Sequence, residues 1–204
     1  MRIRRTPIHP PEILLFDLGG VLIDFAGFEE ILPLLPSQPD RKTLKKRWIE
    51  SDSLRQFERG TLEPQEFGHR FVAEWQLSLS AANFLERFSR WVIGPYPGAL
   101  DLLQGLKGRF RLACLSNSNE LHVVQHRMAL GEHLEKFYFS NEIRHTKPDD
   151  AAFQHVIEDL GTTPEKIAFF DDTPSNVEAA GSMGMAAYLT DGVTELRQCL
   201  KEVI

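Results

Sequence analysis

The stretch Ile13-Leu14-Leu15-Phe16-Asp17-Leu18-Gly19-Gly20 combines a short apolar run with an acid and two glycines. Four consecutive apolar residues are typical of a strand that is buried on both faces of a sheet. Open α/β sheets bind ligands beyond the carboxyl ends of their strands, and Asp17 stands at such an end. The glycines allow a sharp turn and a close approach of a ligand to the backbone. Asp17 is therefore a candidate nucleophile, although an ordinary turn-capping acid explains the same stretch.

Three later segments place polar residues at comparable positions. Two of them follow apolar runs, and the third precedes a helix that a proline introduces. They carry Ser116 with Asn117, Lys147 before Pro148, and Asp171 with Asp172. Each segment alone is explained by a helix cap or a solvated loop residue. Together, however, the four segments favour a single catalytic site at the end of a sheet. Along the chain they supply a nucleophile, a hydroxyl, a cation and a pair of acids.

The rest of the chain predicts an α/β fold with a helical insertion. From residue 94 onward, strand and helix patterns alternate, which is typical of a Rossmann-like parallel sheet with helices on both faces. Residues 12–24 and 94–204 are expected to form this core, with five strands, and 25–93 a helical subdomain inserted after the first strand. Helices are expected at 41–49, 53–59, 64–75 and 80–92, followed by a Gly/Pro-rich linker at 94–98.

The composition restricts the classes of function. A chain of 204 residues with 42% hydrophobic and 25% charged residues is typical of a globular protein with a sizeable core. Its net charge of −6 argues against a nucleic-acid partner, and no apolar stretch is long enough to span a membrane. The two cysteines are too few for a disulfide framework, so a cytoplasmic location is expected. The first eleven residues are expected to form a flexible arm. The oligomeric state is left open.

The four segments together resemble the motifs of the haloacid dehalogenase superfamily of hydrolases. The chain is most similar to the bacterial α-glucose-1-phosphate phosphatase type, which shares an Asp-Leu-Gly first motif. The residues that carry the resemblance are Phe16 to Val21, Leu115 to Asn119, Lys147-Pro148, Phe170 to Asp172 with Asn176, and Glu58-Arg59-Gly60. The resemblance implies a core with a helical cap over the substrate. It also implies a phosphatase that acts on small phosphorylated metabolites, sugar phosphates among them.

The resemblance also implies roles for individual residues. Asp17 would form an aspartyl-phosphate, which splits a difficult hydrolysis into two easier steps. Mg²⁺ would be held by Asp17, the Gly19 carbonyl and Asp172, because hard oxygen ligands suit this ion. Lys147 would stabilise negative charge, and Ser116 and the backbone N–H of Asn117 would donate hydrogen bonds to the phosphoryl group. Asp171 would support the metal ligands from behind. Asn176 would help to hold the metal or its waters.

Gly19 departs from the family pattern. In the family's phosphatases this position usually carries a second aspartate, which protonates the leaving oxygen and then activates water. Such acid–base catalysis contributes roughly 10²–10⁴-fold in rate, and glycine cannot supply it. Three explanations compete: a relay of the proton by solvent or another group, a haloacid- or phosphonate-processing enzyme, or a catalytically weak protein that binds a phosphate ligand or a partner.

The remaining candidates have weaker patterns. Arg55 and Glu58 in the insertion are candidate substrate contacts, although Glu58 also stands where a helix ends. His122 and His126 have a metal-binding spacing but no evident third ligand, so surface or capping histidines are expected. Phe84, Phe88 and Trp91 form an aromatic stripe that is expected to pack in a core.

Overall fold

A five-stranded parallel sheet forms the centre of this computed structural model, which describes residues 10–204. The strand order is β5-β4-β1-β6-β7, so β1 is central. The strands are β1 (Ile13–Phe16), β4 (Arg111–Ser116), β5 (Lys136–Phe139), β6 (Ile167–Asp171) and β7 (Ala186–Leu189). This arrangement confirms the predicted α/β fold. The flexible arm expected at the N-terminus falls largely on residues 1–9, outside the described part of the chain.

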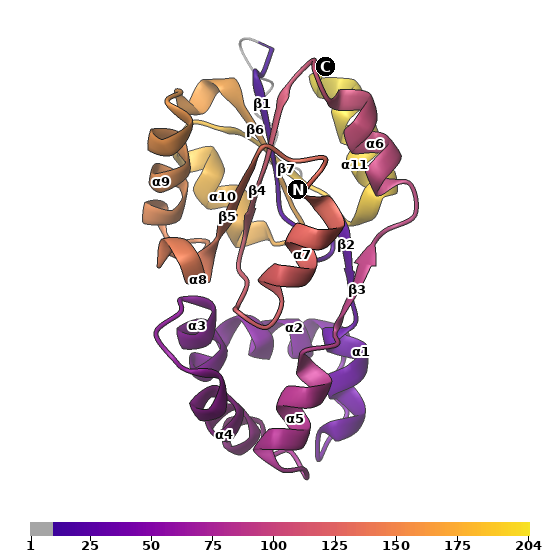
Figure 1. Ribbon diagram of the computed structural model, residues 1–204, viewed down its shortest axis with the longest axis vertical. Helices are drawn as coiled ribbons and strands as arrows, with labels where there is room; N and C mark the ends of the chain where they lie inside the picture. Colours follow the sequence, from indigo (N-terminus) through magenta and orange to yellow (C-terminus); the bar gives the residue numbers. More distant parts are fainter. Residues whose placement is uncertain (1–9) are drawn as a thin grey trace.

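Helices cover both faces of the sheet (Figure 1). On one face lie α6 (Ala99–Leu106), α7 (Val123–Leu130) and α11 (Gly192–Val203). On the other lie α9 (Asp150–Leu160) and α10 (Pro174–Ser182). Short helices α8 (Ser140–Ile143) and η2 (Pro164–Lys166) complete this half of the chain. None of the helices in the described part of the chain is long and apolar enough to cross a bilayer.

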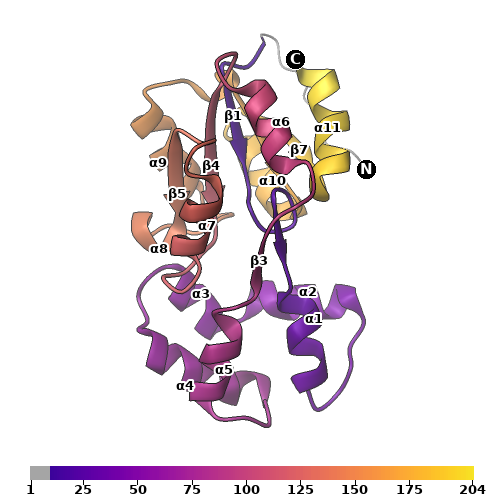
Figure 2. The same cartoon turned by 45° about the vertical axis from the view of Figure 1, so that its right-hand side comes forward.

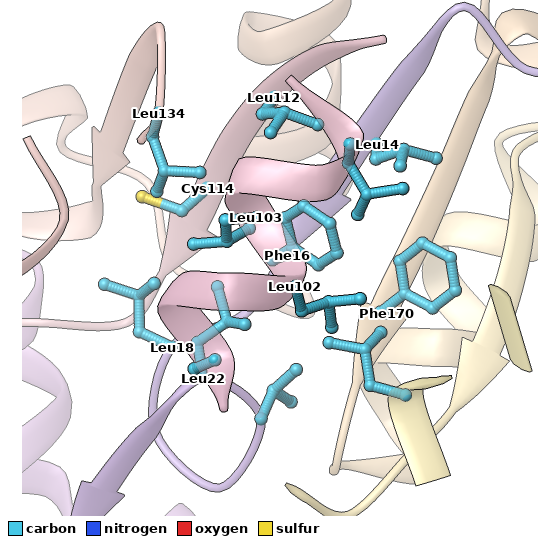
Figure 3. Close-up of a cluster of buried hydrophobic side chains, with 14 of the residues drawn as sticks. Leu14, Phe16, Leu18, Leu22, Leu102, Leu103, Leu112, Cys114, Leu134 and Phe170 are labelled. Atoms are coloured by element: carbon cyan, nitrogen blue, oxygen red, sulfur yellow. The ribbon is translucent and has the colours of Figure 1, made fainter. Parts of the chain in front are cut away.

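The side chains of β1 alternate between the two cores. Leu14 and Phe16 join one cluster, shown in Figure 3, while Ile13 and Leu15 join the other. Phe16 stacks on Phe170 of the neighbouring strand with ring centroids 5.4 Å apart. Fully burying a side chain of this size contributes roughly 1.5–3 kcal/mol. Burial on both faces therefore holds the end of β1, and the acid that follows it, in a rigid position.

Residues 27–88 form a separate group of helices, which we call the helical unit. It contains α1 (Gly27–Ile31), η1 (Leu32–Leu34), α2 (Arg41–Glu50), α3 (Asp52–Glu58), α4 (Pro64–Trp75) and α5 (Ala81–Phe88). The unit lies beyond the carboxyl ends of the sheet strands (Figures 1 and 2). Phe84, Phe88 and Trp91 are buried in its aromatic core, as the stripe predicted. The side chains of Asp40, Ser51 and Ser80 cap three of its helices.

A two-stranded antiparallel ribbon joins the helical unit to the sheet. It pairs β2 (Ile23–Phe25) with β3 (Val92–Pro95), and Figure 2 shows it between the two parts. The prediction that the fourth helix reaches residue 92 is wrong, because it ends at Phe88. Val92 and Ile93 are β-branched and belong to a strand that pairs with β2, far away in the sequence, where Val92 lies opposite Phe25. The expected linker at 94–98 accordingly begins as a strand.

Candidate active site

Asp17 directly follows the central strand and is held there by the backbone. Its N–H donates to the carbonyl of Phe170 on β6 at 2.8 Å, which continues the sheet by one residue. Its Oδ1 accepts the N–H of Leu18 at 2.7 Å and lies 2.9 Å from Lys147 Nζ. Burial raises the pKa of Asp17 above its usual range, and the charge of Lys147 opposes that shift. The carboxylate is thus fixed in direction and paired with one cation.

The two glycines after Asp17 differ in whether the structure would allow a side chain at their position. Gly20 has a φ of +77°, and a Cβ there would lie 2.8 Å from Asp172 Oδ2. Only glycine allows both this conformation and this approach. Gly19 is not among the glycines with positive φ, and a Cβ there would meet only Phe25 Cβ, at 3.9 Å. A side chain at Gly19 is therefore sterically permitted, whereas one at Gly20 is not.

Lys147 and Asp171 form a buried ion pair behind Asp17. Lys147 Nζ lies 2.6 Å from Asp171 Oδ2, and both side chains are at most 1% exposed. Asp171 also accepts the Thr173 N–H at 2.8 Å and the Asn176 amide at 3.0 and 3.1 Å. Burial alone lowers the pKa of Lys147, but the charges of Asp17 and Asp171 outweigh it and raise this pKa above its usual value. Lys147 is consequently a permanent cation at this site.

Asn117 holds the lysine loop by two hydrogen bonds. Its Oδ1 accepts the Lys147 N–H at 2.8 Å, and its Nδ2 donates to the Lys147 carbonyl at 2.9 Å. This side-chain function was not predicted from the sequence, which suggested only a backbone donor. Ser116, the residue before Asn117, ends β4 and is almost fully buried. Ser116 lines the same cavity as Asp17.

Carboxylates from two strand ends converge on one possible cation site. Oxygens of Asp17, Asp171 and Asp172 lie within 4.8 Å of one another. Asp171 is fully buried, and its oxygens accept hydrogen bonds from Lys147, Asn176 and the Thr173 N–H. Asp17 and Asp172 are the two of these acids that line the cavity. Such a set of hard oxygens fits Mg²⁺.

A lysine from the helical unit already contacts this site. Lys45 Nζ on α2 lies 2.7 Å from Asp172 Oδ2 and 3.1 Å from the Asp172 carbonyl. The ammonium group shows that the carboxylate attracts a cation. Lys45 was not identified from the sequence, because it stands among several lysines and arginines on a helix without any motif.

The candidate residues surround one cavity of about 970 Å³ between the sheet and the helical unit. Among the sequence-predicted site residues, those that line it are Asp17, Gly19, Arg55, Glu58, Ser116, Asn117, Lys147, Asp172 and Asn176. Asp171 is not part of the lining, in keeping with support from behind. The helical unit contributes basic residues from α2 and aromatic side chains to the opposite wall, namely Arg41, Lys42, Lys45, Lys46, Phe28, Trp48 and Phe88.

The two histidines are buried, so the expectation of surface residues is wrong, and His122 stands at the N-cap position of α7 without a capping hydrogen bond from its side chain. His122 and His126 are only 4% and 5% exposed. His122 Nε2 lies 2.8 Å from the Phe88 carbonyl, and its ring stacks on Phe88 with centroids 4.6 Å apart. Burial lowers the pKa of His122 to about 4. His122 therefore joins the sheet domain to the helical unit as a neutral ring.

Comparison with known proteins is consistent with this geometry. A sequence model of the haloacid dehalogenase-like hydrolases matches residues 11–184. The D-ribitol-5-phosphate phosphatase of Bacteroides thetaiotaomicron is 22% identical, over 94% of this chain and 97% of its own length. The sesquiterpene phosphatase astK of Aspergillus oryzae is 28% identical, over 90% of this chain and 94% of its own length. The crystal structure of HAD family enzyme BT-2542 from B. thetaiotaomicron, in complex with magnesium and inorganic phosphate, has a TM-score of 0.69. It is 25% identical, with coverage of 89% of this chain and 94% of that one.

Proposed function

The chain belongs to the haloacid dehalogenase-like hydrolases, and we propose that it removes phosphate from small phosphorylated metabolites, with Asp17 as nucleophile. The single observation that carries the proposal is the position of Asp17. This buried carboxylate directly follows the central strand, lines the cavity and is paired with the permanent cation Lys147. The phosphatases among its relatives support the same reaction class.

The chain's residues account for both halves of the reaction. The Asp17 carboxylate attacks phosphorus in line with the leaving alcohol and forms an aspartyl-phosphate. Lys147 offsets the negative charge on the phosphoryl oxygens, and the Ser116 hydroxyl donates a hydrogen bond to one of them. Water then attacks the phosphorus and releases phosphate, which regenerates Asp17. Asp171 and Asn117 keep Lys147 in place through both steps.

Mg²⁺ is the proposed cofactor. The residues that would hold it are Asp17, the Gly19 carbonyl and Asp172, all of which line the cavity. When bound, the ion would neutralise the charge that repels a phosphate dianion from the two carboxylates. Asn176 donates its amide to Asp171, so we assign it to positioning that acid.

We assign residues 25–93 the function of a cap that closes over the substrate. Its helices supply most of the cations at the cavity, which suits anionic substrates. Arg55 and Glu58 on α3 also face the cavity and are the proposed determinants of substrate choice. Sugar phosphates are the substrate class we favour. A reducing compartment such as the cytoplasm remains our expectation for the location.

The proposal is tested by a screen of phosphorylated metabolites with the purified protein. Sugar phosphates, short alkyl phosphates, a 2-haloacid and a phosphonate are each incubated with Mg²⁺ and with a chelator. The expected result is phosphate release from at least one ester, only when Mg²⁺ is present. Halide release in the presence of chelator would favour the haloacid alternative, and binding of esters without turnover would favour a catalytically weak protein.

A further inference from the structure

Cleavage of an alkyl phosphate requires a proton donor that the sheet does not supply. An alkoxide is a poor leaving group unless it is protonated as the P–O bond breaks. Asp17 cannot act both as the nucleophile and as the donor in the same step. Gly19, which follows two positions later, has no side chain. The donor must therefore be another group at the cavity or solvent.

Most ionisable groups that line the cavity are already engaged. Asp172 pairs with Lys45, and Asp149 pairs with Arg59 at 2.6 Å. Lys147 donates to two carboxylates.

Other lining groups are unsuitable in position or protonation state. His122 and His126 are buried and neutral, since burial lowers the pKa of each well below its usual value. Glu50 is exposed beside Lys46. Burial raises the pKa of Tyr96, which makes its hydroxyl a weak acid.

Apart from Asp191, which is exposed at the start of α11, Glu58 is the remaining carboxyl group of the cavity lining. It is half-buried, and its side chain forms no hydrogen bond or ion pair with the described residues. It ends α3 in the helical unit, which lies beyond the carboxyl end of β1 (Figures 1 and 2). In-line attack places the leaving oxygen on the side of phosphorus away from the nucleophile. That side is the one from which a residue of the helical unit approaches.

Contacts of Glu58, Arg59 and Gly60 fix the end of α3 against the sheet half of the chain. The Glu58 carbonyl accepts the hydroxyl of Ser140 at 2.6 Å. The next residue, Arg59, donates to Asp149 Oδ2 at 2.6 Å and to Thr146 Oγ1 at 3.2 Å. Gly60, with a φ of +68°, packs so closely that a Cβ would lie 2.5 Å from the Asn141 carbonyl. The end of α3 is therefore docked beside the lysine loop, and Glu58 is presented to the cavity by a rigid support.

We propose that Glu58 is the general acid and base of this enzyme and replaces the carboxylate that Gly19 lacks. The inference rests on the proposed phosphatase function. In the first step Asp17 forms a bond to phosphorus, the P–O bond to the alcohol breaks, and the Glu58 carboxyl gives its proton to the departing oxygen. In the second step the Glu58 carboxylate takes a proton from water as that water attacks phosphorus. Phosphate leaves, Asp17 is regenerated and Glu58 is again protonated.

The electrostatic surroundings of Glu58 agree with this role. The charged groups that act on it are Lys147 and Asp17 of the sheet domain and Arg55 of its own helix. Burial raises the pKa of Glu58 to about 8, against the opposing charges of Lys147 and Arg55. At neutral pH the carboxyl therefore carries the proton that the first step consumes. A general acid works best when its pKa lies near the working pH.

The test compares two leaving groups in Glu58→Gln. The substrates are p-nitrophenyl phosphate, whose leaving group needs little protonation, and the alkyl phosphate that the wild-type protein hydrolyses fastest. We expect kcat/KM for the alkyl ester to fall by about 100-fold to 10,000-fold, and that for p-nitrophenyl phosphate by less than about 10-fold. Glu58→Asp should recover part of the alkyl ester rate. Glu63→Gln is the matched control, since Glu63 is an exposed acid of the same unit outside the cavity lining.

A pH profile separates catalysis from a purely structural role. For the alkyl ester, wild-type kcat/KM should decline as the pH rises above about 8, because the carboxyl loses its proton there. Glu58→Gln should lack this decline. Equal losses on both esters, or an unchanged alkyl ester rate, would overturn the role of Glu58 while leaving Asp17-dependent hydrolysis intact. Failure of the wild-type protein to hydrolyse either ester would instead overturn the proposed function.

Discussion

Lys45 of the helical unit forms an ion pair with Asp172 of the sheet domain, with 2.7 Å between Nζ and Oδ2. Asp172 is also the carboxylate that we assign to Mg²⁺. A lysine ammonium group and a divalent cation repel each other and cannot both bind that oxygen strongly, so binding of the metal must weaken or displace the lysine contact. Release of Lys45 would free a cation at the cavity for the substrate phosphate. The pair thus links metal binding to the position of the helical unit.

Lys45→Met is expected to tighten the binding of Mg²⁺. The substitution removes both the competing contact and a nearby positive charge. Since the two side chains are 29% and 22% exposed, the effect should be modest, about 3-fold to 10-fold in Kd. Isothermal titration of the substrate-free protein measures it directly. Lys46→Met removes the same charge one position away, where the lysine lies near Glu50 instead, and should change Kd less. Weaker Mg²⁺ binding in Lys45→Met would show that the lysine does not compete.

Gly20→Ala and Gly19→Ala should differ sharply in their free energy of unfolding and in their affinity for Mg²⁺. The first forces a side chain into positive φ and against Asp172 Oδ2, and we expect a loss of roughly 1–3 kcal/mol in the free energy of unfolding, together with weaker Mg²⁺ binding. The second has only an ordinary contact with Phe25 and should stay within about 1 kcal/mol of the wild type. Urea denaturation and metal titration of both variants provide the comparison. Similar losses in the two variants would refute the assignment of the close approach to Gly20.

Gly19→Asp tests whether the missing carboxylate limits the reaction. The backbone tolerates the side chain, so the variant should fold. In the Glu58→Gln background, the new carboxylate should raise the rate for alkyl esters by at least about 10-fold, because the acid becomes available again. Esters with good leaving groups should gain much less. The quantity to measure is the ratio of the two rates at equal Mg²⁺ saturation, and an unchanged ratio would mean that solvent already supplies the proton.

Acid should destabilise the protein through His122. Burial lowers the pKa of its ring from 6.5 to about 4, so between these values the unfolded chain binds more protons than the folded one. The stability that the neutral His122 ring contributes is therefore present above pH 6.5 and is lost as the pH falls towards 4. His122 should contribute a loss of roughly 2 kcal/mol between pH 7 and pH 5. The free energy of unfolding of His122→Gln should vary less over this range, while exposed His69→Gln should behave as the wild type. Identical slopes in all three proteins would contradict this account.

Most motif residues were predictable because they stand at or just after the end of a strongly patterned strand, whereas Lys147 was marked by the proline and helix that follow it. The apolar runs ending at Phe16, Leu115 and Phe170 became adjacent buried strands, so the polar residues after them meet at one sheet edge. Helix α4 begins and ends at the predicted residues, since Pro64 favours a first turn and the pattern of buried aromatic residues is regular.

Features that depend on long-range pairing were not predictable. The ribbon of β2 and β3 is short, contains Gly94 and Pro95, and exists only through a partner distant in the sequence. Lys45 and the side chain of Asn117 act through contacts that no local pattern reveals. For Glu58, its place at the end of a helix favoured a structural role over substrate contact. Only the docking of α3 against Ser140 and Asp149 shows that it is held at the cavity.

The most direct measurement of the central claim is phosphate release by Asp17→Asn. The amide is close in size to the carboxylate but is a far weaker nucleophile, so the cavity is preserved while the first step is blocked. With Mg²⁺ and the best substrate of the screen, we expect the rate to fall by at least about 1,000-fold in a protein whose thermal unfolding remains cooperative. Phosphate release at close to the wild-type rate would contradict the assignment of Asp17 as the nucleophile.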